Sequence, residues 1–232
     1  MTKKAQIYIG LVIASGFGLI ASCLASEQGL PHSEGYLVYC LLAWLASALK
    51  VRLPGVSGTI SLNFLFILIA VAVFTFSETV LLAAAGCIIQ CMWRARSRPK
   101  MVQVCFNVAT LSLSSGAAYR LSHVLAGSTA AHLTVLLTVA ASFYFTADTL
   151  LISGVLALVQ DQPLFDVWQQ CYLWSFPYYL AGALLATLAV ETNRTSGWLM
   201  SLLILIPMCL IYVFYRLCVD RIGGRRPATA ER

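Results

Sequence analysis

Charged residues are scarce in this 232-residue sequence. Asp, Glu, Lys and Arg together make up 10% of it, against about 25% in an average soluble domain. Hydrophobic residues account for 60%, compared with about 45–50% in soluble domains, and the mean hydropathy is +0.84. This composition excludes a soluble enzyme, a nucleic-acid-binding domain and a disordered chain. We therefore expect a polytopic membrane protein.

The sequence also lacks the short motifs of common catalytic and nucleotide-binding sites. It contains no Walker loop, no HExxH, no GxSxG and no dinucleotide-binding glycine fingerprint. Its eight cysteines form no CxxC pair, and Cys87 and Cys91, one helical turn apart, bring no further ligands with them. We expect no enzymatic activity, no metal and no cofactor, and we interpret the cysteines as small buried hydrophobic residues.

What the sequence does contain is a series of apolar runs near the length that crosses a bilayer. They predict an all-α, polytopic transmembrane helix bundle over 1–217, followed by a basic cytoplasmic tail at 218–232. About eight spans are expected, at 6–25, 35–49, 59–76, 79–93, 101–125, 131–158, 172–190 and 197–217. The sixth is long, so it must tilt, kink or protrude, and Asp148 and Gly154 are the places where a break would fall. Pro177 should kink the seventh.

The distribution of Lys and Arg predicts the orientation, because these residues are retained on the cytoplasmic side. With a cytoplasmic N-terminus, 13 of the 15 Lys and Arg fall inside, and only Arg120 and Arg194 lie toward the outside. An even number of spans then places both termini in the cytoplasm, at the inner membrane of a bacterium. A competing interpretation takes Ile20 to Cys23 as a lipoprotein cleavage site, which would leave seven spans. The charge count favours a retained first helix.

The stretch between the second and third spans holds the densest group of unusual residues. Gly55 and Gly58 permit backbone conformations that other residues avoid. Arg52 beside the free amides of a helix N-terminus would form an anion-binding site. The simpler alternative is a loop and helix cap in which Arg52 follows the positive-inside rule.

A second group is the basic loop behind Trp93, which contains Arg94, Arg96, Arg98 and Lys100. Four cations just inside the membrane attract anionic lipid headgroups or an acidic partner. Anchoring of the topology explains them equally well.

Polar side chains inside spans are costly and are functional candidates by default. Asn63, Asn107 and Asp148 belong to this class. Hydrogen bonds between helices are the alternative role for the two asparagines, and the small residues from Ser112 to Gly116 suit close helix packing. The carboxylate of Asp148 needs a cation, a proton or water, and Arg120 is the cation within the membrane that the sequence offers.

The region after the sixth span is rich in aromatic residues. An amphipathic or re-entrant segment is predicted at 161–170, at the inner interface. An interfacial aromatic belt explains the region well. A cavity lined by Trp174, Tyr178 and Tyr179 is the alternative.

Three stretches carry a resemblance to a known family: Leu53 to Leu62, Trp93 with its basic loop, and Pro99 to Ala109. They resemble the N-terminal membrane-associated sensor domains of bacterial cyclic-di-GMP signalling proteins, which precede HD-GYP phosphodiesterase or GGDEF cyclase domains. The resemblance implies an input module. The 15 residues from Cys218 to Arg232 are too few for an output domain, so we expect either a module that works through partners or a chain from which the output half is missing.

Two functions follow from these observations. The first is a membrane sensor that recognises a small molecule or lipid and couples to a cytoplasmic partner; the second is a permease or the substrate-binding membrane subunit of a transporter. Membrane lipids and a second copy of the chain are further expected partners, and nucleic acid is not. The candidate ligand-binding residues are Arg52, Gly55, Gly58, Asn63, Trp93, Asn107 and Asp148.

Overall fold

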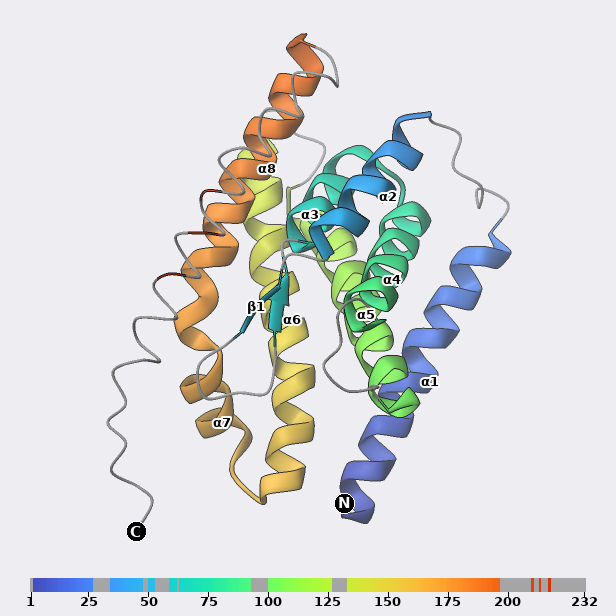
Figure 1. Cartoon of the computed structure of the whole chain (residues 1–232), viewed down its shortest axis with the longest axis vertical. Coiled ribbons are helices and arrows are strands. Elements are labelled where there is room, and N and C mark those ends of the chain that lie inside the picture. Colours follow the sequence, from blue (N-terminus) through green and yellow to red (C-terminus); the bar gives the residue numbers. More distant parts are fainter. Residues whose placement is uncertain are drawn as a thin grey trace.

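The computed structural model describes residues 2–26, 34–47, 50–52, 59–61, 63–92, 100–126 and 133–196, with the isolated positions 210, 213 and 217. They form a helical bundle (Figure 1). Its elements are α1 (Lys3–Ala25), α2 (Glu34–Ser47), β1 (Lys50–Arg52), β2 (Thr59–Ser61), α3 (Asn63–Val73), α4 (Phe76–Met92), α5 (Met101–Ala126), α6 (Leu133–Gln160), α7 (Leu164–Cys171), the 3-10 turn η1 (Leu173–Ser175) and α8 (Phe176–Ser196). The predicted eighth span and the tail fall largely outside the described residues.

Three of the described helices, α1, α5 and α6, are long and apolar enough to cross a membrane. They agree closely with the spans predicted at 6–25, 101–125 and 131–158. The span predicted at 59–76 is shorter than expected, because its first residues form β2 and α3 begins only at Asn63. With 11 residues, α3 is about 16 Å long, roughly half of the hydrocarbon core.

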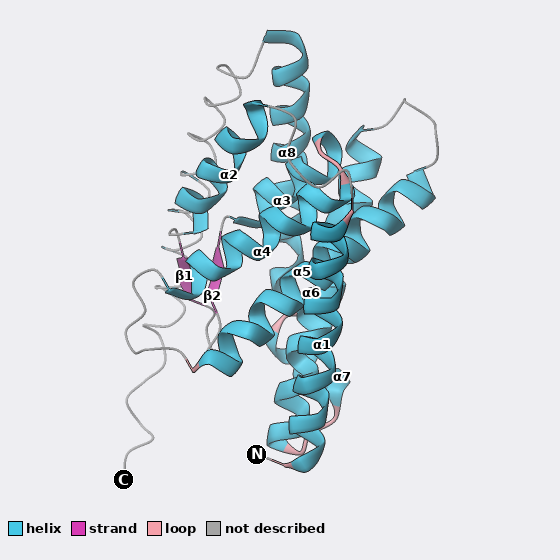
Figure 2. Ribbon diagram, turned by 90° about the vertical axis from the view of Figure 1, so that its right-hand side faces the viewer, coloured by secondary structure: helices cyan, strands magenta, loops and turns pink. Residues whose placement is uncertain are grey.

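The bundle is helical, as predicted, with one short strand pair before the third helix, in the stretch for which the sequence left an anion-binding site or a loop and helix cap open. β1 and β2 are antiparallel, with Lys50 opposite Ser61 and Arg52 opposite Thr59. Pairing of the two strands satisfies backbone N–H and C=O groups that would otherwise be costly in a membrane protein. The two strands overlap α6 in the view of Figure 1, but Figure 2, turned by 90°, shows them apart from it.

Helix α6 runs without interruption through 28 residues, so the long span is one helix with no break at Asp148 or Gly154. Gly154 instead allows α1 to come close, because a Cβ atom there would lie 2.5 Å from the hydroxyl oxygen of Tyr8. The Tyr8 hydroxyl donates a hydrogen bond to the carbonyl oxygen of Leu151 at 3.1 Å. The glycine is therefore a contact site between helices.

The segment after α6 is organised differently from the predicted kinked span. Pro177 is the second residue of α8, directly after η1. Proline is tolerated in a first helical turn, where its missing N–H has no partner to lose. The predicted amphipathic segment at 161–170 corresponds to α7, which buries Val167 and exposes Leu164 and Phe165.

Helix α3 occupies the centre of the core, and its residues from Asn63 to Val71 are all buried. It packs against α2, α4, α6 and α8, while α5 packs against α1, α4 and α6. The close packing predicted for the small residues of α5 is confirmed at Gly116, where a Cβ atom would lie 3.2 Å from Leu19 of α1. Gly16 of α1 likewise packs directly on Ala109.

Candidate functional site

Asn63 is the first residue of α3, and its side chain is buried against α4. The residue is 1% exposed. A Cβ atom on Gly86 would lie 2.5 Å from Nδ2 of Asn63 and 2.8 Å from its Oδ1, so only a glycine leaves room for this amide. Neither amide atom has a hydrogen-bond partner among the described residues. A buried polar group without a partner lowers the free energy of unfolding by about 1–3 kcal/mol. Among the described residues, no hydrogen bond between helices explains why Asn63 is buried.

The amide lies deep in the bundle. The turn between α3 and α4 is fixed by Thr75, whose backbone N–H and hydroxyl both donate to Oε2 of Glu78 at 2.9 Å. Gly86 follows Phe76, the first residue of α4, by ten positions, which corresponds to about 15 Å along the helix. Non-helical backbone at such a depth is tolerated where it is buried in protein or lines a water-filled space, and β2 precedes α3 directly at this level.

Asp148 is a second buried polar residue without a described partner. It is 9% exposed, and its Oδ1 is buried without a hydrogen-bond partner among the residues that the structure describes. Tyr144 lies one turn earlier on the same face of α6.

The cation that the sequence suggested for Asp148 is engaged elsewhere. The guanidinium of Arg120 lies over the ring of Phe76, 4.5 Å from its centroid. Arg194 pairs with Glu191 at 3.7 Å, which is the one ion pair within the described ranges. Arg120, the cation that the sequence offers within the membrane, therefore does not pair with Asp148.

Further buried hydroxyl groups lack a partner in the described part of the bundle. Thr110 and Ser114 lie one turn apart on one face of α5, and Ser153 lies on α6. Thr149, by contrast, is fully bonded: its hydroxyl accepts a hydrogen bond from Nε1 of Trp168 at 2.9 Å and donates one to a backbone carbonyl. Within the described residues, buried hydroxyl groups therefore lack a partner at some positions and are fully hydrogen-bonded at others.

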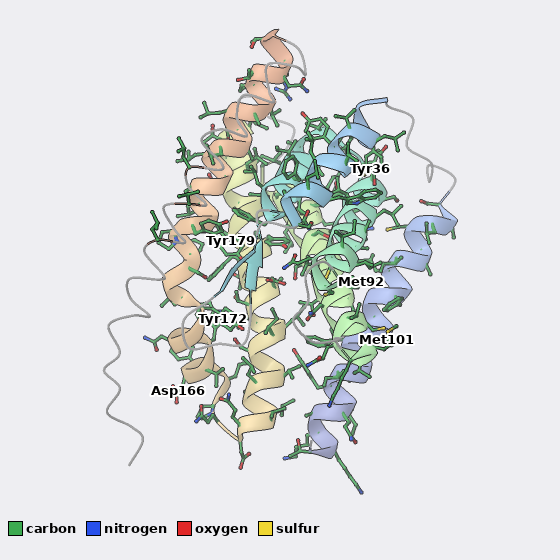
Figure 3. The ribbon with its side chains drawn as sticks, in the orientation of Figure 1. Tyr36, Met92, Met101, Asp166, Tyr172 and Tyr179 are labelled. Carbon is green, nitrogen blue, oxygen red and sulfur yellow. The ribbon has the colours of Figure 1, made fainter. Side chains whose placement is uncertain are left out.

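Aromatic rings of α3, α6 and α8 pack against one another. Phe64, the neighbour of Asn63, packs on Tyr178 and Tyr179 with ring centroids 5.0 and 4.9 Å apart. Tyr179 also lies 6.1 Å from Tyr144, and Figure 3 shows it between α8 and α6. The sequence offered a cavity lined by Trp174, Tyr178 and Tyr179. Tyr178 and Tyr179 pack on Phe64 instead, and the side chain of Trp174 lies outside the described residues.

Three of the other predicted site residues, Asn107, Arg52 and Lys100, lie within the described residues. Asn107 is exposed on α5 and donates from Nδ2 to Sγ of Cys91 at 3.5 Å. Arg52 belongs to β1, and Lys100 is exposed just before α5. The residues outside the described part are Gly55, Gly58, Trp93, Arg94, Arg96 and Arg98. Sequence reasoning missed Gly86, although the run of small residues that begins at Ala83 was a usable sign of close packing.

The model of the MASE9 family, a family of membrane-associated sensor domains, matches residues 36–190. The chain belongs to the MASE9 family. The matched MASE9 segment extends from α2 into α8 and contains Asn63, Gly86 and Asp148, while α1 precedes it. This finding confirms the sensor-domain part of the resemblance noted in the sequence. No curated protein and no solved structure matches the chain.

Proposed function

We propose that this chain is the membrane-embedded input module of a signalling system, which binds a small molecule or lipid inside its helical bundle. The observation that carries the proposal is the pair of buried polar groups, Asn63 and Asp148, left without partners in the described core of a sensor-domain family member. Such groups are retained at a cost in stability. Recognition of a ligand is the role that accounts for them.

The signal leaves the site through α6. Asp148 precedes Gln160, the last residue of α6, by twelve positions, and α7 follows directly. The inner half of α6 is also tied to α1, since the hydroxyl of Thr2 donates to the carbonyl oxygen of Leu158 at 3.2 Å. A ligand that binds one arrangement of these helices better than another shifts the population toward it.

The module itself is not an enzyme in this proposal, and its output is a cytoplasmic partner. The resemblance to domains that precede HD-GYP and GGDEF enzymes supports a partner that makes or degrades a cyclic dinucleotide. The positive-inside distribution of Lys and Arg supports eight spans with both termini in the cytoplasm of a bacterium. The basic loop, of which Lys100 is an exposed member, provides a contact for lipid headgroups or for that partner.

Native mass spectrometry of the full chain, released gently from detergent, tests the proposal. We expect a defined small-molecule or lipid adduct on the wild type, and its loss in Asn63→Leu, which replaces the amide with an apolar group of similar size. Asn107→Ala is the matched control, because Asn107 is exposed and lies outside the site. A clean protein mass in every variant would contradict ligand binding.

A permease is the competing function. Once the ligand is identified from the adduct, a transport assay distinguishes a permease from a sensor. Reconstituted in vesicles, a permease would move the identified ligand across the bilayer, and transport would fall in Asn63→Leu. A sensor would bind the ligand without moving it.

A further inference from the structure

Arg120 of α5 is an exposed cation without a carboxylate partner among the described residues. It is one of the two Lys or Arg residues predicted to lie toward the outside, and the other, Arg194, pairs with Glu191 at 3.7 Å. The carboxylate of Glu78 in α4 is occupied by Thr75, whose N–H and hydroxyl both donate to it at 2.9 Å. The N–H donors of Arg120 are therefore available to an anion from outside the chain.

The position of Arg120 along α5 matches the depth of a headgroup layer. Helix α5 is one of the described helices long and apolar enough to cross a membrane. It begins at Met101, directly after the exposed Lys100. Arg120 follows Met101 by 19 residues, about 28 Å along the helix, and the hydrocarbon core is about 30 Å thick. With Lys100 at the headgroups of one leaflet, Arg120 lies at the headgroups of the other.

An aromatic ring holds the guanidinium of Arg120 in place on a lipid-facing surface. The guanidinium lies over the ring of Phe76 in α4, 4.5 Å from its centroid, and Tyr119 packs edge-on against Phe76 at 5.6 Å. The apolar residues Leu121 and Val124 beside Arg120 are exposed, so this face of α5 meets lipid. A donor that is already ordered loses less conformational entropy when it binds a ligand.

His123 adds a second polar group to the same surface. Its ring is stacked on Tyr119 with the centroids 4.2 Å apart, and it follows Arg120 by three positions, the spacing of neighbours on one helix face. A carbonyl oxygen only accepts hydrogen bonds, so the 2.8 Å contact of Nδ1 with the carbonyl oxygen of Tyr119 places a proton on Nδ1. The other nitrogen, Nε2, faces no described partner and donates to a phosphate oxygen when the ring is protonated.

We propose that Arg120 and His123 bind the phosphate group of a membrane phospholipid. A guanidinium presents a planar pair of N–H donors that matches phosphate oxygens, and Nε2 of His123 donates to the same group. The acyl chains then follow the apolar surface of the bundle toward the middle of the bilayer. A soluble phosphate offers the same oxygens, but the exposed Leu121 and Val124 favour the lipid. This site is separate from Asn63 and does not depend on the proposed function.

Native mass spectrometry of the full chain in mild detergent tests the inference, because it resolves individual lipid adducts. Phosphatidylglycerol is the probe, and sn-glycerol 3-phosphate is a phosphate without acyl chains. We expect Arg120→Gln to hold one phosphatidylglycerol fewer than the wild type at equal lipid concentration, because the affinity of this site falls about tenfold with the loss of a charge-assisted hydrogen bond. The basic loop also attracts this lipid, so the difference between variants is the readout. Glycerol phosphate should give no adduct.

Two further variants connect the lost adduct to the site. Arg194→Gln makes the same exchange at the other arginine predicted outside, which pairs with Glu191, and should hold as many lipids as the wild type. His123→Phe keeps an aromatic ring for Tyr119 but removes Nε2, and should weaken the same adduct about threefold or more. The His123 variant keeps the test decisive even if Arg120→Gln does not fold.

Three results would overturn the lipid site. The first is an unchanged set of adducts in Arg120→Gln or in His123→Phe. The second is an equal loss in Arg194→Gln, which would make the effect one of net charge. The third is binding of glycerol phosphate that depends on Arg120 and matches the lipid in affinity, which would assign the site to a soluble phosphate.

Discussion

Two buried threonines, Thr110 in α5 and Thr149 in α6, differ in their hydrogen bonds and hardly in their exposure. Thr149→Val removes the acceptor of the Trp168 indole N–H, which lies 2.9 Å away. We expect it to lower the free energy of unfolding by about 1–2 kcal/mol. Thr110→Val removes a hydroxyl without a partner among the described residues, and should leave stability unchanged or raise it by up to about 1 kcal/mol. Unfolding in detergent measures both.

Equal losses in the two valine variants would mean that Thr110 has a partner that supports the fold. A gain at Thr110 accompanied by loss of the ligand adduct would extend the site to α5. The comparison is well matched, because both exchanges replace a hydroxyl with a methyl group and leave the volume of the side chain almost unchanged.

At the scale of single residues, the sequence predicted the type of the candidates better than their surroundings. Asn63 and Asp148 were recognised because polar groups are costly inside apolar runs, and the structure buries both. Asn107 met the same criterion and is exposed, since the face that a residue presents depends on which helices pack against it. Gly86 carries no polar atom in its side chain, so its role became visible only through the amide that occupies its space.

At the scale of elements, close contacts between helices depend on glycines that leave room for a neighbour. Gly86→Ala would place a Cβ atom 2.5 Å from Nδ2 of Asn63, so the Asn63 side chain or the two helices must shift. We expect a loss of about 1–3 kcal/mol in the free energy of unfolding. Gly18→Ala in α1 meets nothing within 4 Å and should stabilise the protein by about 0.5–1 kcal/mol, the usual gain for this exchange in a helix.

The two alanine variants are compared by thermal unfolding under identical detergent conditions. A Gly86 variant as stable as the wild type would show that α3 adapts to the added methyl group and that the fit of Asn63 against α4 is loose. The ligand adduct is measured on the same samples, because displacement of Asn63 should weaken binding even where the fold persists.

Hydropathy predicted the long helices well and the short elements poorly. The boundaries of α1, α5 and α6 lie close to those of long, predominantly apolar runs. The pairing of β1 with β2 depends on contacts between residues that are not adjacent in sequence, and three-residue strands leave no periodic pattern to detect. The same strands shorten α3, so an apolar run that looked like one span was divided between two elements.

At the scale of the whole molecule, the bundle has two ends, and the side of the membrane on which each end lies can be tested. Figure 1 shows the N-terminus and the turn after α6 at one end, and the last residues of α8 at the other. The distribution of Lys and Arg predicts that the first end is cytoplasmic. Single cysteines introduced at Lys100 and Asp161, both exposed, should therefore react with a membrane-impermeant maleimide only after permeabilisation of the cells.

Cysteines introduced at Thr75 and Thr195, exposed residues near the opposite end, should react in intact cells. Labelling of the wild-type chain measures the reaction of its own cysteines and is subtracted. Lys100 comes directly before α5 in the sequence, and Asp161 comes directly after α6. If both positions are labelled from the same side of the membrane, the chain must cross the membrane in α5 and return in α6. If Lys100→Cys were labelled in intact cells, the predicted orientation would be wrong, and the basic loop would lie outside the cell. The cytoplasmic partner would then have to contact a different surface, which makes orientation the property on which the signalling proposal depends at this scale.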